Sequence, residues 1–110
     1  MAYNEALAER IRKQTEKKKG FSERKMFGGI CFMINGNMAC GIVGNDLMVR
    51  VGLQNYPKLL KGLHVRPMDF TGRPLKGFVY VSTKGYSRQE SLNKWIGIGT
   101  DYAKSLPTKI

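Results

Sequence analysis

The sequence predicts an α+β fold: an antiparallel sheet of about five strands, a three-strand meander plus a hairpin, with N- and C-terminal helices and one short middle helix packed on it. Two tight-turn signals with apolar runs on either side lie within residues 26–51. Helical spacing of apolar residues marks both ends of the chain, and residues 65–83 hold two further strand-like runs. A length of 110 residues fits a single domain, residues 1–110.

An N-terminal helix is expected to begin at Glu5, with Asn4 as its N-cap residue. Leu7 and Ile11 lie four residues apart and form a narrow apolar stripe. The lysines that follow suit the negative end of a helix, and Gly20 is typical of the residue just after one. The helix is therefore predicted to extend almost to Gly20.

Two turns organise residues 26–51. Asn35 and Gly36 form the pair that most readily takes positive φ at both central positions of a type I′ turn. A second turn is expected at residues 44–45. The segment is therefore predicted to form three antiparallel strands.

These turns set a register in which Cys31 lies opposite Cys40, and Cys40 lies opposite Val49. One face of the meander then carries only apolar side chains: Cys31, Met33, Met38, Cys40, Ile42, Leu47, Val49 and Val51. The other face is mixed and includes Phe32, Ile34, Met48 and Arg50. A slip of one residue would bury Arg50, which favours this register.

Gly28 and Gly29 follow residues 21–25, which are expected to lead into the first strand. Because glycine weakens a strand, the pair predicts a β-bulge or the close approach of another backbone. The alternative is a nest of backbone amides for an anion, but neither a helix N-terminus nor a P-loop lysine follows.

A short helix is predicted within residues 52–62, because Pro57 suits a first helical turn and Gly62 suits a helix end. Three leucines are expected to pack it on the core: Leu59, Leu60 and Leu63.

Two strands are predicted after this helix, within residues 65–70 and 77–83. Pro67 places the first at a sheet edge, since proline cannot donate to a ladder. In the second, Val79 and Val81 alternate with Phe78 and Tyr80 and should lie on opposite sides. A tight hairpin is expected at residues 71–72.

The last helix carries a capping-box pattern, with Ser87 as N-cap and Glu90 three residues on. Gly97 and Gly99 within it indicate either a close crossing or a kink, and Pro107 ends it. Its apolar face is broad: Leu92, Trp95, Ile96, Tyr102, Ala103 and Leu106.

Residues 25–51, KMFGGICFMINGNMACGIVGNDLMVRV, resemble the N-terminal domain of the TfoX/Sxy competence-regulator family. The matching positions are Met26, Phe27, Gly28, Gly29, Asn35, Gly36 and residues 47–51. The resemblance extends over residues 66–81 and to Trp95. It implies an α+β domain that regulates competence genes together with the cyclic-AMP receptor protein. Full-length members carry a second, helix-hairpin-helix domain, so a chain of this length is expected to be a stand-alone member.

The charge balance is the strongest compositional signal, with 19 basic and 8 acidic residues and a net charge of +11. Such a chain is attracted to polyanions, nucleic acid first among them, although many small basic proteins carry charge for solubility alone. Seven residues are the candidate phosphate contacts: Arg10, Lys13, Lys17, Lys18, Lys19, Arg24 and Lys25.

No catalytic constellation, cofactor site or metal site is predicted. The two cysteines permit a cross-strand disulfide in the expected register, but in a reducing cytoplasm two buried thiols are favoured. His64 has only Asp69 as a nearby carboxylate and no serine nucleophile, which favours a surface or half-buried histidine at an element boundary.

Two functions from different classes remain. The first is a non-enzymatic regulatory or adaptor domain that binds a protein through a sheet face or edge, and that can form a homodimer through an exposed apolar strip of Phe32, Ile34 and Met48. The second is a nucleic-acid-binding module that contacts phosphates without base specificity. The absence of an apolar leader or span favours a cytoplasmic protein without a membrane partner.

Overall fold

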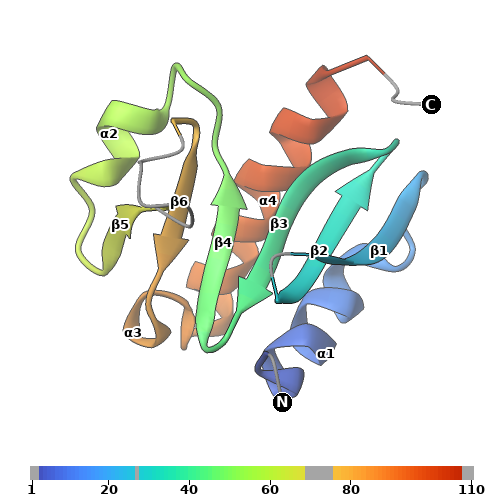
Figure 1. The fold of residues 1–110 in the computed structure, drawn as a ribbon, viewed down its shortest axis with the longest axis horizontal. Helices are drawn as coiled ribbons and strands as arrows, with labels where there is room; N and C mark the ends of the chain where they lie inside the picture. Colours follow the sequence, from blue (N-terminus) through green and yellow to red (C-terminus); the bar gives the residue numbers. More distant parts are fainter. Residues whose placement is uncertain (1–2, 27, 69–75, 108–110) are drawn as a thin grey trace.

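The computed structural model describes residues 3–26, 28–68 and 76–107, and these form one antiparallel sheet with helices packed on it (Figure 1). The sheet has six strands in the order β1-β2-β3-β4-β6-β5. The strands are β1 (Phe21–Met26), β2 (Gly29–Ile34), β3 (Asn37–Val43), β4 (Asp46–Arg50), β5 (Val65–Pro67) and β6 (Phe78–Val81). The helices are α1 (Glu5–Thr15), α2 (Tyr56–Leu60), α3 (Thr83–Tyr86) and α4 (Gln89–Ser105). The α+β prediction is confirmed, and the additional strand is β1, which the sequence had suggested only as a lead-in.

The main core lies between the sheet and the helices. Figure 1 shows α4 running along the far side of β3 and β4. Leu7 and Ile11 of α1 and Leu92 and Ile96 of α4 pack into one cluster with the strands. The strand residues of that cluster are Ile30, Phe32, Cys40, Ile42, Leu47, Val49, Val79 and Val81. We call this side of the sheet the helix side.

The turn between β2 and β3 forms as predicted, with φ of 54° at Asn35 and 81° at Gly36. Beside the turn, Met33 lies opposite Met38 as expected. The register then shifts between Phe32 and Met33, so that Phe32 lies opposite Cys40. β3 therefore contains a bulge at Ala39, and the predicted pairing of Cys31 with Cys40 is wrong.

The bulge reverses the predicted sides of β2. Side chains alternate between the two faces along a strand. One additional residue at Ala39 therefore moves the side chains of β2, and those of β3 before the bulge, to the face opposite the predicted one. Phe32 lies on the helix side, whereas Cys31 and Met38 pack with Met48 in a second cluster on the opposite side. The predicted pairs of Cys40 with Val49 and of Ile42 with Leu47 are confirmed. The ladder ends at Cys40 and Val49, so the expected continuation to Met38 and Val51 does not form.

Gly99 explains why α4 can lie so close to the bulge. A Cβ atom built at Gly99 would lie 2.3 Å from the carbonyl oxygen of Ala39, whereas one at Gly97 would meet nothing within 4 Å. Of the two alternatives for this glycine pair, the close crossing is confirmed at Gly99. The helix and the bulge fit each other because Gly99 has no side chain.

The glycine pair at the start of β2 serves a turn, so the bulge predicted there is wrong. Met26 pairs with Gly29, and Gly28 has a φ of 74°. The close backbone approach is confirmed at Gly29, where a Cβ would lie 1.9 Å from the carbonyl oxygen of Ile42.

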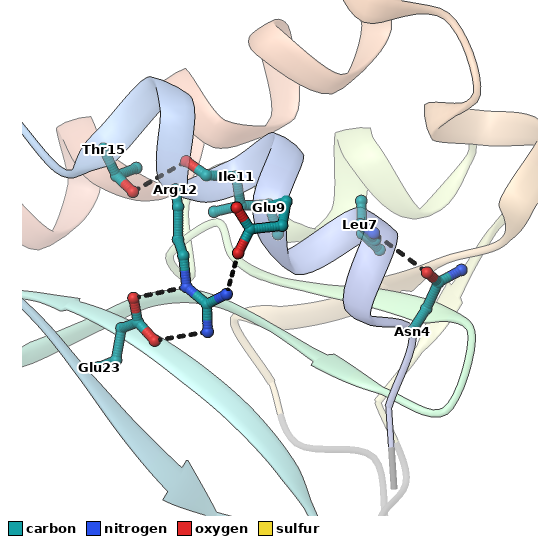
Figure 2. A network of polar contacts seen from close by, with 7 residues as sticks. All are labelled: Asn4, Leu7, Glu9, Ile11, Arg12, Thr15 and Glu23. Atoms are coloured by element: carbon teal, nitrogen blue, oxygen red, sulfur yellow. Dashed lines mark hydrogen bonds and ion pairs between the residues drawn. The ribbon is translucent and has the colours of Figure 1, made fainter. Parts of the chain in front are cut away.

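The helix ends differ from the prediction in two places. The Asn4 cap is confirmed, since its side-chain oxygen accepts from the Leu7 amide at 3.0 Å (Figure 2). However, α1 ends at Thr15, well before Gly20. The N-cap residue of α4 is Arg88, because the preceding short helix α3 takes Ser87 as its own C-cap.

The second half of the sheet follows the prediction. β5 is an edge strand, and Val79 and Val81 face the helix side while Phe78 and Tyr80 face the opposite side. Pro57 lies in the first turn of α2. Leu59 and Leu60 pack on the core, but Leu63 is exposed, so its predicted packing is wrong. Phe27, Asp69 and the hairpin expected at residues 71–72 lie outside the described residues.

Candidate functional site

The predicted apolar strip is not on the surface. Phe32 and Ile34 are each 1% exposed and Met48 is 0% exposed. Phe32 and Ile34 pack toward α1 and α4, whereas Met48 packs with Tyr80 on the opposite side of the sheet. The expectation of an exposed strip is therefore wrong: the bulge turns Phe32 and Ile34 toward the helices, and the second cluster covers Met48 on the opposite side. The predicted homodimer surface is lost with it.

Arg10, one of the candidate phosphate contacts, is engaged within the fold. Its Nη2 donates to the carbonyl oxygens of Tyr86 at 3.3 Å and Ser87 at 3.1 Å, and its Nε donates to Gln89 Oε1 at 3.4 Å. These bonds tie α1 to the junction of α3 and α4. The guanidinium is therefore less free to bind phosphate than the sequence suggested.

The other candidate cations are spread over three segments. Lys13 lies on α1, Lys17 to Lys19 follow that helix, and Arg24 and Lys25 lie on the edge strand β1. All of them are exposed except Lys18, which is half-buried. They belong to one stretch of the chain that runs from α1 to the edge strand β1.

Acidic residues lie among these cations. Arg12 makes two hydrogen bonds to the Glu23 carboxylate, at 2.9 and 3.0 Å, and an ion pair with Glu9 (Figure 2). The bonds to Glu23, and then that to Glu9, raise the pKa of Arg12 above its usual range. This network joins α1 to β1 and partly neutralises the surface that was predicted to bind nucleic acid.

The two cysteines are free and buried. Cys31 lies opposite Gly41 and belongs to the second cluster, whereas Cys40 belongs to the helix-side core. Burial raises the pKa of Cys31 to about 11 and that of Cys40 to about 12. The prediction of two buried thiols is confirmed. The bulge places the two side chains on opposite faces, so they do not form the cross-strand pair that a disulfide would need.

His64 lies at an element boundary, just before β5, and is exposed. Its backbone has a φ of 69°, and its carbonyl oxygen accepts from the Ser82 amide at 2.9 Å. Across the described residues, no three His, Cys, Asp or Glu side chains gather in a way that could hold a metal ion. None of the described helices is long and apolar enough to cross a membrane.

Two arginines stacked on aromatic rings were missed in the sequence. The Arg50 guanidinium lies 5.4 Å from the ring centres of Phe78 and Tyr102. Arg66 lies 4.8 Å from the Tyr80 ring centre and pairs with Asp46 at 2.6 Å. The cross-strand pairs Arg50–Phe78 and Arg66–Tyr80 could have been found from the strand alternation, had the order of the strands been known.

The surface around α2 was also missed. Leu53 is 67% exposed and Leu63 is 82% exposed, and in the chain the first precedes α2 and the second follows it. Pro57, Lys58 and Lys61 are exposed between them. We call these five residues the α2 outer surface. The leucine spacing in the sequence had suggested a core role for Leu63, but the helix ends before that residue.

Comparison with protein families gives one finding that covers most of the fold. The family model described as the TfoX N-terminal domain matches residues 13–102. This range includes all six strands and the α2 outer surface. Comparison with curated proteins and with solved structures gave no match.

Proposed function

The chain belongs to the TfoX N-terminal domain family, and from this membership we propose that it is a non-enzymatic regulatory or adaptor domain that acts by binding another protein. The family match carries the proposal, since it extends over the whole sheet. Transcription regulation, of competence genes in particular, is the setting that the resemblance implies.

The exposed features of the fold favour contact through an edge or a helix. The sheet has two edge strands, β1 and β5. β5 is short and ends in Pro67, which discourages strand addition, and β1 carries charged side chains that do the same. The α2 outer surface has exposed apolar side chains and is the better candidate for protein contact.

The proposal is tested by capturing partners from an extract of the protein's own cells with the tagged chain, followed by reconstitution with the purified candidate. An unrelated basic protein of matched size and charge is the control bait. We expect one partner that binds the chain in purified form with a defined stoichiometry and does not bind the control. Capture of the same proteins by both baits, or no binding by any purified candidate, would contradict the proposal.

A nucleic-acid-binding module is the second candidate, supported by the net charge of +11. Six candidate cations other than Arg10 are available on the surface: Lys13, Lys17, Lys18, Lys19, Arg24 and Lys25. If all six contact phosphates of duplex DNA, a log–log plot of affinity against salt should have a slope of about −5. Fluorescence anisotropy between low and moderate salt measures this slope. Equal binding by a charge-matched control protein would remove this candidate.

A further inference from the structure

We propose that the α2 outer surface is the docking site for an acidic amphipathic segment of a partner protein, one that presents apolar side chains beside carboxylates. The inference rests on the proposed function, since it names the chemistry of the protein partner. Three observations carry it: the orientation of α2, the exposure of two leucines, and the distribution of charge.

The helix α2 divides into an inner and an outer side. Tyr56, Leu59 and Leu60 pack against the core and hold the helix on the sheet. Lys58 and Lys61 are three residues apart and therefore lie on one side of the helix, where both are exposed. The core thus fixes α2 in an orientation that presents two lysines outward.

Two exposed apolar side chains precede and follow these lysines in the chain. Leu53 and Leu63 are the large hydrophobic residues that the described structure leaves exposed. Leu53 precedes α2 and Leu63 follows it, so the lysines stand between two leucines along the chain. A partner that covers this surface would bury apolar area from the leucines together with its contacts to the lysines.

The charge of this region selects an acidic partner. Residues 47–68 contain four basic residues, Arg50, Lys58, Lys61 and Arg66, and no Asp or Glu. Arg66 pairs with Asp46, which leaves Lys58 and Lys61 as the cations of the outer surface. By contrast, the cations around α1 are interspersed with Glu9 and Glu23. Complementary charge across an interface speeds encounter and suppresses partners of like charge.

The same charges disfavour other occupants. A second copy would bring two further lysines onto the first pair, at a net charge of +11 for each chain. Nucleic acid would satisfy the lysines but leave the leucines without a partner. An amphipathic protein segment with leucines and glutamates satisfies both.

The probe is a synthetic amphipathic peptide of about 18 residues, with leucines along one helical face and glutamates along the other. Binding to the full chain is measured by fluorescence anisotropy. The test variants are Leu53→Ala with Leu63→Ala, and Lys58→Gln with Lys61→Gln. The matched control is Lys17→Gln with Lys19→Gln, which removes the same charge from two exposed residues near α1.

We expect each test variant to bind the peptide about tenfold more weakly than the unchanged chain, and the matched control to stay within about twofold. The lysine variant should also lose much of the salt dependence. Thermal unfolding should be unchanged in all variants, because the substituted side chains are exposed.

Several outcomes would overturn the inference. They are no binding of the peptide, equal weakening by the matched control, an unchanged affinity of the leucine variant, and tighter, leucine-dependent binding to vesicles of equal phosphatidylglycerol and phosphatidylcholine. Duplex DNA that binds through Lys58 and Lys61 without the leucines would also count against it. If a reconstituted partner binds the test variants as well as the unchanged chain, this inference fails while the proposed function stands.

Discussion

Single residues decide how closely the helix layer approaches the sheet, and Gly99 is the clearest case. Gly99 lies directly against the bulge, and any side chain at this position would meet the Ala39 carbonyl oxygen. Two positions along the same helix, Gly97 faces open space. Substitutions at Gly97 and Gly99 therefore separate the effect of packing on stability from the effect of helix propensity.

Gly99→Ala should lower the free energy of unfolding by about 1–3 kcal/mol, because α4 or the bulge must move to admit the methyl group. Gly97→Ala should raise it by up to about 1 kcal/mol through helix propensity alone. Urea unfolding followed by circular dichroism measures both. A Gly99→Ala protein as stable as the Gly97→Ala protein would show that the close crossing is not required.

The two thiols should be unreactive in the folded protein at pH 8. Both are buried, and their pKa values of about 11 and about 12 keep them protonated at that pH. A thiol reagent such as Ellman's should therefore react slowly with the folded chain and titrate two thiols after denaturation without reductant. Rapid reaction of one thiol in the folded chain, or fewer than two after denaturation, would disagree with this arrangement.

At the scale of elements, α1 is attached to the rest of the fold by both apolar and polar contacts. Leu7 and Ile11 pack into the core, Arg10 reaches the α3–α4 junction, and Arg12 reaches β1. β1 in turn is an edge strand with a neighbour on one side only. The Arg12–Glu23 pair therefore links two peripheral elements.

A double-mutant cycle with Arg12→Met and Glu23→Gln should give a coupling free energy of about 0.5–1 kcal/mol, because both side chains are partly exposed. The coupling should shrink at high salt. Urea unfolding of the four proteins supplies the cycle. If the two side chains did not interact, the changes in the free energy of unfolding of the two single variants would sum to that of the double variant.

The elements that were predicted well have signals contained in a few neighbouring residues. Asn35 and Gly36 specify their turn, Pro67 specifies an edge, and Val79 and Val81 specify a side of the sheet. The bulge at Ala39 lies against Gly99 of α4, some 60 residues later in the chain, and neither flanking turn signals it.

The candidate site was harder to predict because sequence patterns constrain exposed residues less than they constrain core residues. Leu63 has the spacing of a core residue, yet α2 ends before it. The sequence suggests that Arg10 is a free cation, because its hydrogen-bond partners lie more than 70 residues away in the chain. Phe32 lies on the mixed face only in a continuous register, and the bulge interrupts that register.

At the scale of the whole molecule, charge and burial together predict a monomer. The residues that had suggested a dimer surface are buried, and each chain carries a net charge of +11. Light scattering after size exclusion should give the mass of one chain, 12.4 kDa, at moderate salt. A dimer that persists under those conditions would require an interface on another part of the surface.

The bulge also has a consequence for how relatives can differ in length. In β2 the residues facing the helices are Ile30, Phe32 and Ile34, and in β3 they are Ala39, Cys40 and Ile42. Ala39 and Cys40 are consecutive and both face the helices, so the alternation of side chains in β3 shifts by one position at the bulge. Removing a single amino acid there would turn Ile30, Phe32 and Ile34 away from the helices and break their packing, so we expect this fold to tolerate a one-residue deletion at its loop ends far better than at that point inside a strand.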